Sequence, residues 1–155
     1  MTVKIVTIKD KKEERFLRKK TADFDFDRFS KKEVHDLIIK MKNAMDEAEG
    51  IGLAANQIGL DMNVFVARVD GKFYSIFNPK IIKRSKEISG MEEGCLSVPD
   101  FRDEAFRNEK ITLEGFDKNN KKVKIKAWGL LACVFQHEVD HLNGKLFIDR
   151  TKAPK

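Results

Sequence analysis

Apolar residues recur at helical spacing in one stretch of the chain, from residue 31 to residue 49. These positions, three or four residues apart, are Val34, Leu37, Ile38, Met41, Met45 and Ala48. Ser30 and Glu33 form the S-x-x-E pattern of a capping box in front of this stretch. Gly50 is suited to end a helix. The pattern therefore predicts an amphipathic helix over this stretch.

After Gly50 the apolar positions alternate with polar ones, and β-branched or aromatic residues become common. Five stretches carry this strand pattern: 62–69, 72–78, 80–89, 111–117 and 122–128. The pair Asp70-Gly71 separates the first two stretches and is typical of a tight hairpin turn. The polar residues 118–121 separate the last two in a similar way. We therefore expect antiparallel strands through the middle of the chain.

A second helix is predicted from residue 129 to residue 143, ending at Gly144. It contains the run LLACVF and is apolar almost all round, so it should be buried. Together these elements predict an α+β fold, with antiparallel strands wrapped around a central helix near the C-terminus. The length of 155 residues corresponds to one domain, 1–155.

Composition narrows the class of protein. Apolar residues make up 41% of the chain, enough to bury a core without disulfides. The 31 Lys and Arg exceed the 25 Asp and Glu, and this net charge of +6 is spread thinly along the sequence. Such a surplus favours solubility rather than dedicated nucleic-acid binding. The charged run Lys9–Lys20 lacks the interleaved aromatic residues of an RNA-binding patch, so we expect a solvated helix or loop there.

The sequence also indicates the cellular compartment in which the protein works. No run of 18 apolar residues predicts a transmembrane helix, and the first 15 residues have no signal-peptide core. Two cysteines, Cys95 and Cys133, are too few for a secreted disulfide framework. We therefore expect a cytoplasmic protein whose cysteines are free thiols or metal ligands.

The segment 136–141, QHEVDH, places the pattern H-E-x-x-H in the buried helix. His137 and His141 are one turn apart on one face, so two imidazoles can bind the same ion. Glu138 is close to that face and can reach a water molecule beside the ion. A pair of core histidines beside a surface glutamate is the alternative. Buried histidines need polar partners, which an ion supplies, so we favour a metal site.

A catalytic metal site of this kind needs a third protein ligand and an open position. Only 14 residues follow His141 and none is Glu, so we expect the ligand upstream. Cys133 is one turn before His137, but on a straight helix its Cα would be about 12 Å from that of His141. We therefore expect Cys133 to be a core or pocket residue. Cys95, in a glycine-punctuated segment that we predict as a loop, is the better candidate.

The sequence resembles the peptide deformylase family in three motifs that occur in the family's order. They are GIGLAANQ at 50–57, EGCLS at 93–97 and QHEVDH at 136–141. The resemblance covers about residues 30–149. It implies a metal-dependent hydrolase that removes the formyl group from the N-terminal formyl-methionine of nascent polypeptides and releases formate.

The resemblance also implies residue roles. The positions that match the metal ligands are Cys95, His137 and His141. Glu138 matches the general acid and base, and Gln57 and the backbone N–H of Leu96 match the donors that stabilise the oxyanion. The expected substrate-binding positions are Ile51, Gly52, Gly94, Leu130 and Cys133. The last two, with His137, are expected to line the pocket for the methionine side chain.

The family also implies a cofactor and partners. We expect one divalent metal ion, with Fe²⁺ as the native metal, while a Cys/His/His set also accepts Zn²⁺, Ni²⁺ or Co²⁺. The expected partners are N-formylmethionyl peptides, with a transient contact to the ribosome. We expect neither DNA nor a membrane as a partner.

Two other functions fit parts of the sequence. A metal-dependent endopeptidase or amidase would share the H-E-x-x-H helix but use a different third ligand. A non-enzymatic domain with a structural metal could use the net charge to bind RNA or the ribosome. Structural zinc sites have four protein ligands, and the sequence offers three good ones, which argues against this last function.

Overall fold

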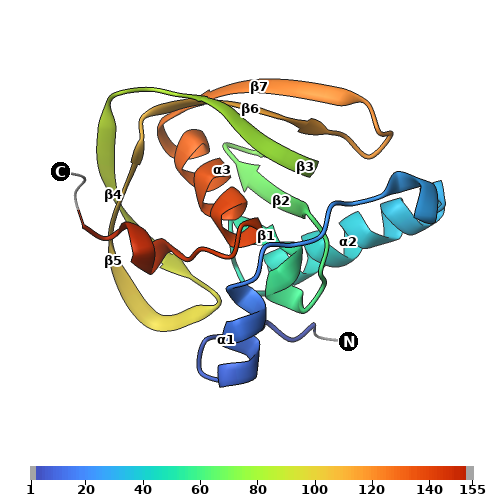
Figure 1. Ribbon diagram of the computed structural model, residues 1–155, viewed down its shortest axis with the longest axis horizontal. Helices are drawn as coiled ribbons and strands as arrows, with labels where there is room; N and C mark the ends of the chain where they lie inside the picture. The colour runs from blue at the N-terminus through green and yellow to red at the C-terminus, as the bar shows by residue number, and fades with distance from the viewer. Residues whose placement is uncertain (1–2, 153–155) are drawn as a thin grey trace.

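The computed structural model describes residues 3–152. Two antiparallel sheets enclose helix α3 (Gly129–Leu142), which is red-orange in Figure 1, and the longer helix α2 (Lys31–Glu47) packs on the other side of the larger sheet. Helix α1 (Lys11–Leu17) covers part of the charged N-terminal run. Three short 3₁₀ turns complete the helical elements: η1 (Phe26–Arg28), η2 (Ala55–Ile58) and η3 (Phe147–Arg150). The predicted fold class, strands around a central C-terminal helix, is confirmed.

The larger sheet has five strands in the order β1-β2-β3-β6-β7, and each neighbouring pair is antiparallel. Its strands are β1 (Gly52–Ala54), β2 (Val64–Val69), β3 (Lys72–Arg84), β6 (Lys110–Phe116) and β7 (Lys122–Trp128). The smaller sheet is the hairpin of β4 (Ile88–Cys95) and β5 (Val98–Asn108). Strand β1 lies at one edge of the larger sheet, so one side of its backbone is free of strand partners.

Short sequence patterns correctly located most of the helices and strands. The Ser30 and Glu33 capping box forms as predicted at the start of α2. The helix ends slightly earlier than expected, and Glu49 rather than Gly50 takes the left-handed conformation, with φ of 58°. The β2–β3 turn has positive φ at both Asp70 and Gly71, as its sequence predicts.

Two predictions in the middle of the chain are wrong. Residues 80–89 are not a separate strand, because β3 continues to Arg84 and β4 begins at Ile88. The segment 92–99 is not a loop, since it forms the end of β4, a tight turn and the start of β5. Gly90 and Gly94 interrupt the alternation of apolar and polar residues that would have marked the strand.

Both faces of the larger sheet contribute to a core. On one face Phe65 and Leu113 pack with Phe135 of α3. On the other face α2 buries Met41 and Met45 against β1, β2 and the first half of β3. The site-bearing helix is therefore enclosed, while α2 covers only part of the opposite face.

The N-terminal segment joins the two sheets. The backbone N–H of Val6 donates to the carbonyl of Gln57, and that of Ile8 donates to the carbonyl of Ser97. These bonds hold η2 beside the turn that follows β4. Among residues 3–152, no helix has both the length and the apolar character needed to cross a membrane.

Candidate metal centre

Cys95, His137 and His141 meet where the end of β4 approaches α3. Their ligand atoms all lie within 4.8 Å of one another. The Sγ of Cys95 is 3.2 Å from Nε2 of His141, and the two histidine Nε2 atoms are 3.2 Å apart. The structure therefore brings together the three residues that the sequence predicted as ligands, from positions 46 residues apart in the chain.

The spacing of these atoms fits a bound metal ion. Zinc–nitrogen and zinc–sulfur bonds of about 2.0–2.3 Å at tetrahedral angles put neighbouring ligand atoms about 3.3–3.6 Å apart. Two of the three separations, at 3.2 Å, are close to these values, and the third is within 4.8 Å. Among the described residues the cluster contains three donors, which leaves a tetrahedral ion one position for another ligand.

Glu138 is buried beside the cluster. It is 4% exposed, and its Oε1 has no hydrogen-bond partner among the described residues. Burial is the largest influence on its carboxyl group and raises the pKa to about 7. A Cβ atom at Gly52 would collide with this carboxylate, so glycine at that position allows β1 to pass close to it. Glu138 is thus packed between α3 and β1 with an unpaired oxygen.

Gln57 is fixed in a buried position rather than exposed at the surface. Its Oε1 accepts from the backbone N–H of Ala54 at 3.0 Å. Its Nε2 donates to Ser97 Oγ at 3.1 Å and to Cys95 Sγ at 3.6 Å. The amide therefore presents its donor side towards the metal cluster.

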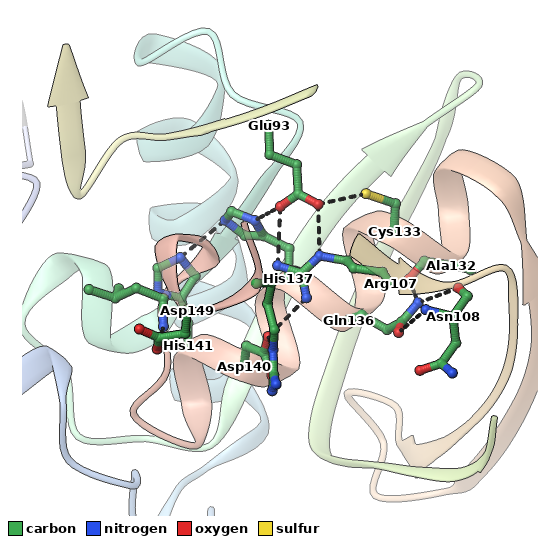
Figure 2. A network of polar contacts seen from close by, with 12 residues as sticks. Glu93, Arg107, Asn108, Ala132, Cys133, Gln136, His137, Asp140, His141 and Asp149 are labelled. Carbon is green, nitrogen blue, oxygen red and sulfur yellow. Dashed lines mark hydrogen bonds and ion pairs between the residues drawn. The ribbon is translucent and has the colours of Figure 1, made fainter. Parts of the chain in front are cut away.

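Figure 2 shows a polar network around His137 that is centred on Glu93. This buried carboxylate accepts from His137 Nδ1 at 2.8 Å, from Arg107 at 2.7 Å and 3.1 Å, and from Cys133 Sγ at 3.1 Å. The bond to Nδ1 turns Nε2 of His137 towards Cys95 and His141. Cys133 donates to this network and lies outside the metal cluster, as the helix geometry predicted.

Arg107 of β5 connects both ligand-bearing elements. It donates to Glu93, two residues before Cys95, and through Nη1 to Asp140, next to His141, at 2.8 Å. Asp140 also accepts from Arg150 at two oxygens. The chain of ion pairs thus ties β4 to α3 at the level of the metal cluster.

The same contacts govern protonation. Burial opposes the ionised form of Glu93, but its bonds from His137 and Arg107 outweigh burial and lower the pKa to about 2. Burial and the negative charge of Glu93 raise the pKa of Cys133 to about 12, so its thiol remains a donor. Burial and the nearby charge of His137 hold the pKa of His141 well below its usual range.

The pKa of His137 shifts in the opposite direction. Burial opposes its charged form, yet the Glu138 carboxylate and bonds to Cys95 and Glu93 raise the pKa to about 10. A positive charge is therefore favourable where the three ligand atoms meet. A divalent ion would supply that charge in place of the proton.

A cavity of about 780 Å³ opens onto the cluster. The predicted substrate-binding and oxyanion residues that line it are Ile51, Gly52, Gln57, Gly94, Leu96, Leu130 and Cys133. Ile51 is 52% exposed and Leu130 is 42% exposed, so apolar side chains border the opening. All site residues predicted from the sequence thus line this cavity, apart from His141, which belongs to the cluster and is fully buried.

Three buried residues of the site were not predicted. Glu93 and Asp140 lie inside quoted motifs, EGCLS and QHEVDH, but had no assigned role. The role of Glu93 follows from a general rule, since a histidine ligand donates its other ring N–H to a carboxylate, a backbone carbonyl or water. Arg107 carries no local signal in the sequence.

The chain is similar to known proteins over most of its length. The sequence model of the family described as polypeptide deformylase matches residues 2–155. The peptide deformylase of Methylocella silvestris is 44% identical over 131 residues, covering 79% of this chain and 67% of the relative.

Solved structures agree with the sequence relatives. The crystal structure of peptide deformylase from Thermotoga maritima has a TM-score of 0.89 at 32% identity and covers 99% of both chains. A Met-Ala-Ser-bound class I type b peptide deformylase from Acinetobacter baumannii has a TM-score of 0.90 at 28% identity, covering 97% of this chain and 98% of that one. The chain therefore belongs to the peptide deformylase family, metal-dependent hydrolases that remove the formyl group from the N-terminal methionine of nascent polypeptides.

Proposed function

We propose that this chain deformylates nascent polypeptides through one divalent ion held by Cys95, His137 and His141. The observation that carries the proposal is the convergence of these three ligand atoms beside the buried carboxylate of Glu138. An ion at this site would supply Lewis-acid activation of water and of the formyl carbonyl. We propose Fe²⁺ as the native metal, and the same donors also suit Zn²⁺, Ni²⁺ and Co²⁺.

Glu138 moves the proton in this proposal. Its unpaired oxygen accepts the proton of the attacking water and later delivers it to the amine that leaves as the C–N bond breaks. Gln57 Nε2 and the backbone N–H of Leu96 donate to the formyl oxygen as it becomes negative. The bond from Ala54 to Gln57 Oε1 supports this role, because it keeps the amide from rotating its donor side away.

The substrate backbone binds along the free edge of β1. Ile51 and Gly52 border the cavity, and β1 has a strand partner on one side only, so an extended peptide can add to the sheet there. Gly94 lines the same cavity and leaves room for the peptide. The methionine side chain would lie against Leu130, Cys133 and His137, which line the cavity together. The Met-Ala-Ser bound to the Acinetobacter relative supports a peptide beginning with methionine.

Further parts of the proposal concern the protein in the cell. We propose that residues 1–155 form one catalytic domain, that the protein works in the cytoplasm, and that it contacts the ribosome transiently. The family's action on nascent chains supports the last two, since such chains emerge from the ribosome.

Formate release from formyl-Met-Ala-Ser by anaerobically purified, iron-loaded protein tests the proposal. Glu138→Gln should keep the ion and lose about 10²–10⁴-fold in kcat, because only the proton transfer is removed. Cys95→Ala should lose the ion itself. Glu87→Gln, the same change at an exposed glutamate away from the cavity, serves as the matched control.

Three results would contradict the proposal. Full activity of Glu138→Gln would exclude its acid–base role. Unchanged ion content in Cys95→Ala would exclude the thiolate ligand. Cleavage of an internal peptide bond without formate release would favour the endopeptidase that shares this helix motif.

A further inference from the structure

The face of the five-stranded sheet that carries α2 is only partly covered. Helix α2 packs over β1, β2 and the first half of β3, where Val64, Val66 and Phe77 are buried. Beyond this cluster the second half of β3, together with β6 and β7, continues the same face. Exposed side chains on these strands are therefore free to meet a partner.

Six lysines occupy this area, which we name the basic sheet face: Lys80, Lys83, Lys110, Lys122, Lys124 and Lys126. The three on β7 alternate with Val123 and Ile125, which are half-buried against the α3 side. Lysines at every second position of one strand point to the same side.

The strand register places the other three lysines on the same side. Residues opposite one another in antiparallel strands share a face of the sheet. Lys124 lies opposite Glu114, and Glu114 lies opposite Lys80. Thr112 joins Lys126 to Lys83 in the same way. Lys110 is two residues from Thr112 on β6 and therefore also points outward.

This face carries a local excess of positive charge. Among the described residues of the face, Glu114 is the one carboxylate, and its Oε2 is 3.1 Å from Nζ of Lys122. Six lysines and one glutamate give this face a net charge of +5. Strand pairing thus gathers on one surface lysines that lie far apart in the sequence.

Trp128 ends the basic sheet face. It lies opposite Lys110 and is 67% exposed, the largest exposed fraction among the large hydrophobic residues described. It is also the only tryptophan of the chain. Proteins bind single-stranded nucleic acids with a similar combination of groups. An aromatic ring stacks on a base, and lysines neutralise the phosphates.

Protection of the sheet edge explains only part of this arrangement. Lysines commonly cover an edge strand and prevent its pairing with other chains, and β7 is an edge strand. Lys80, Lys83 and Lys110 lie on β3 and β6, which have strand partners on both sides. Their positive charge therefore needs another reason.

We propose that the basic sheet face binds single-stranded RNA, with phosphates along the lysines and a base stacked on Trp128. Lysines two residues apart on a strand are about 6.8 Å apart, so the row of lysines on β7 can follow the phosphates of an extended single strand. RNA binding needs none of the deformylation chemistry. We identify the RNA as ribosomal because nascent chains emerge beside ribosomal RNA. This identification rests on the proposed function.

Titration with oligouridine tests this proposal through the fluorescence of Trp128, since no other tryptophan contributes. We expect saturable quenching and a salt-dependent affinity. The triple variant Lys83→Gln, Lys124→Gln, Lys126→Gln should lower the slope of log K against log salt by about 2, because each lost phosphate contact contributes about 0.7.

The matched control removes the same charge from α1 and α2 through Lys11→Gln, Lys31→Gln and Lys40→Gln, all exposed positions. It should leave the slope unchanged. Trp128→Leu should keep the slope and weaken binding about tenfold, measured by the anisotropy of labelled RNA. Formate release from a short formyl peptide, assayed separately in each variant, shows whether the deformylase proposal holds regardless of RNA binding.

Two results would overturn the RNA-binding proposal. An equal decrease in the slope of log K against log salt in the sheet and control variants would mean that RNA binding depends only on the net charge of the protein. Equal quenching by polyglutamate would mean that the face takes any polyanion, with no stacking of bases. Quenching by oligouridine alone, lost in the sheet variant, would support it.

Discussion

The two long helices bury their residues in different ways. Helix α2 is amphipathic, and its buried positions are all apolar: Val34, Ile38, Met41, Ala44 and Met45. Helix α3 is buried on nearly every side, and its buried residues include Gln136, Glu138, Asp140 and His141. One helix stabilises the fold by the apolar area that it removes from water. The other also buries polar groups, of which Gln136 and Asp140 have partners while Glu138 keeps an unpaired oxygen.

This difference separates residues that only stabilise the fold from residues that also orient the metal ligands. Substitutions in the stripe of α2 should change the free energy of unfolding and leave the metal cluster intact. Substitutions in the network around α3 should change both, because the same ion pairs hold the fold and orient the ligands. The predictions below test this separation.

The largest effect is expected for Arg107→Met. It leaves Glu93 without its main cation and removes one of the partners of Asp140. Removing one partner of a buried ion pair costs about 3–5 kcal/mol in the free energy of unfolding. Urea denaturation measures this loss, and metal affinity should fall as well. An unfolding free energy equal to that of the unmodified protein would contradict the account of the network.

Met41→Ala should destabilise the α2 side by about 2–5 kcal/mol, since Met41 is fully buried between the helix and the sheet. The folded fraction should keep its metal content and its kcat for formate release. Denaturation and activity measured on the same preparation check both parts. A fall in metal affinity equal to that of Arg107→Met would mean that the two helices are not separable.

The smallest effect is expected for Ser30→Ala, which removes the hydroxyl that caps α2 at Glu33. The expected loss is about 1 kcal/mol in the free energy of unfolding, with unchanged kcat. Thermal denaturation measures it. Lys32→Ala, a nearby exposed change without a capping bond, is the control and should cost less.

Elements marked by local signals could be predicted from the sequence. The α2 capping box, the Asp70-Gly71 turn and the buried helix with His137 and His141 all follow from residues close together in the chain. Cys95 was found by elimination of other ligands, and its place at the end of a strand was missed. Two glycines in β4 hide the alternation that would have identified that strand.

Long-range partners could not be predicted. Glu93 and Arg107 are 14 residues apart, and Arg107 and Asp140 are 33 apart, so no periodicity relates them. The basic sheet face was missed for a similar reason. Lys80 and Lys124 lie on the same surface only because β3, β6 and β7 pair in one register.

The central claim is that one thiolate and two imidazoles hold an ion with one position left for solvent. X-ray absorption spectroscopy of the zinc-loaded protein tests it most directly. The account predicts one sulfur at about 2.3 Å and three nitrogen or oxygen ligands at about 2.0–2.1 Å, with the sulfur lost in Cys95→Ser. A second sulfur, or a spectrum unchanged by Cys95→Ser, would contradict it.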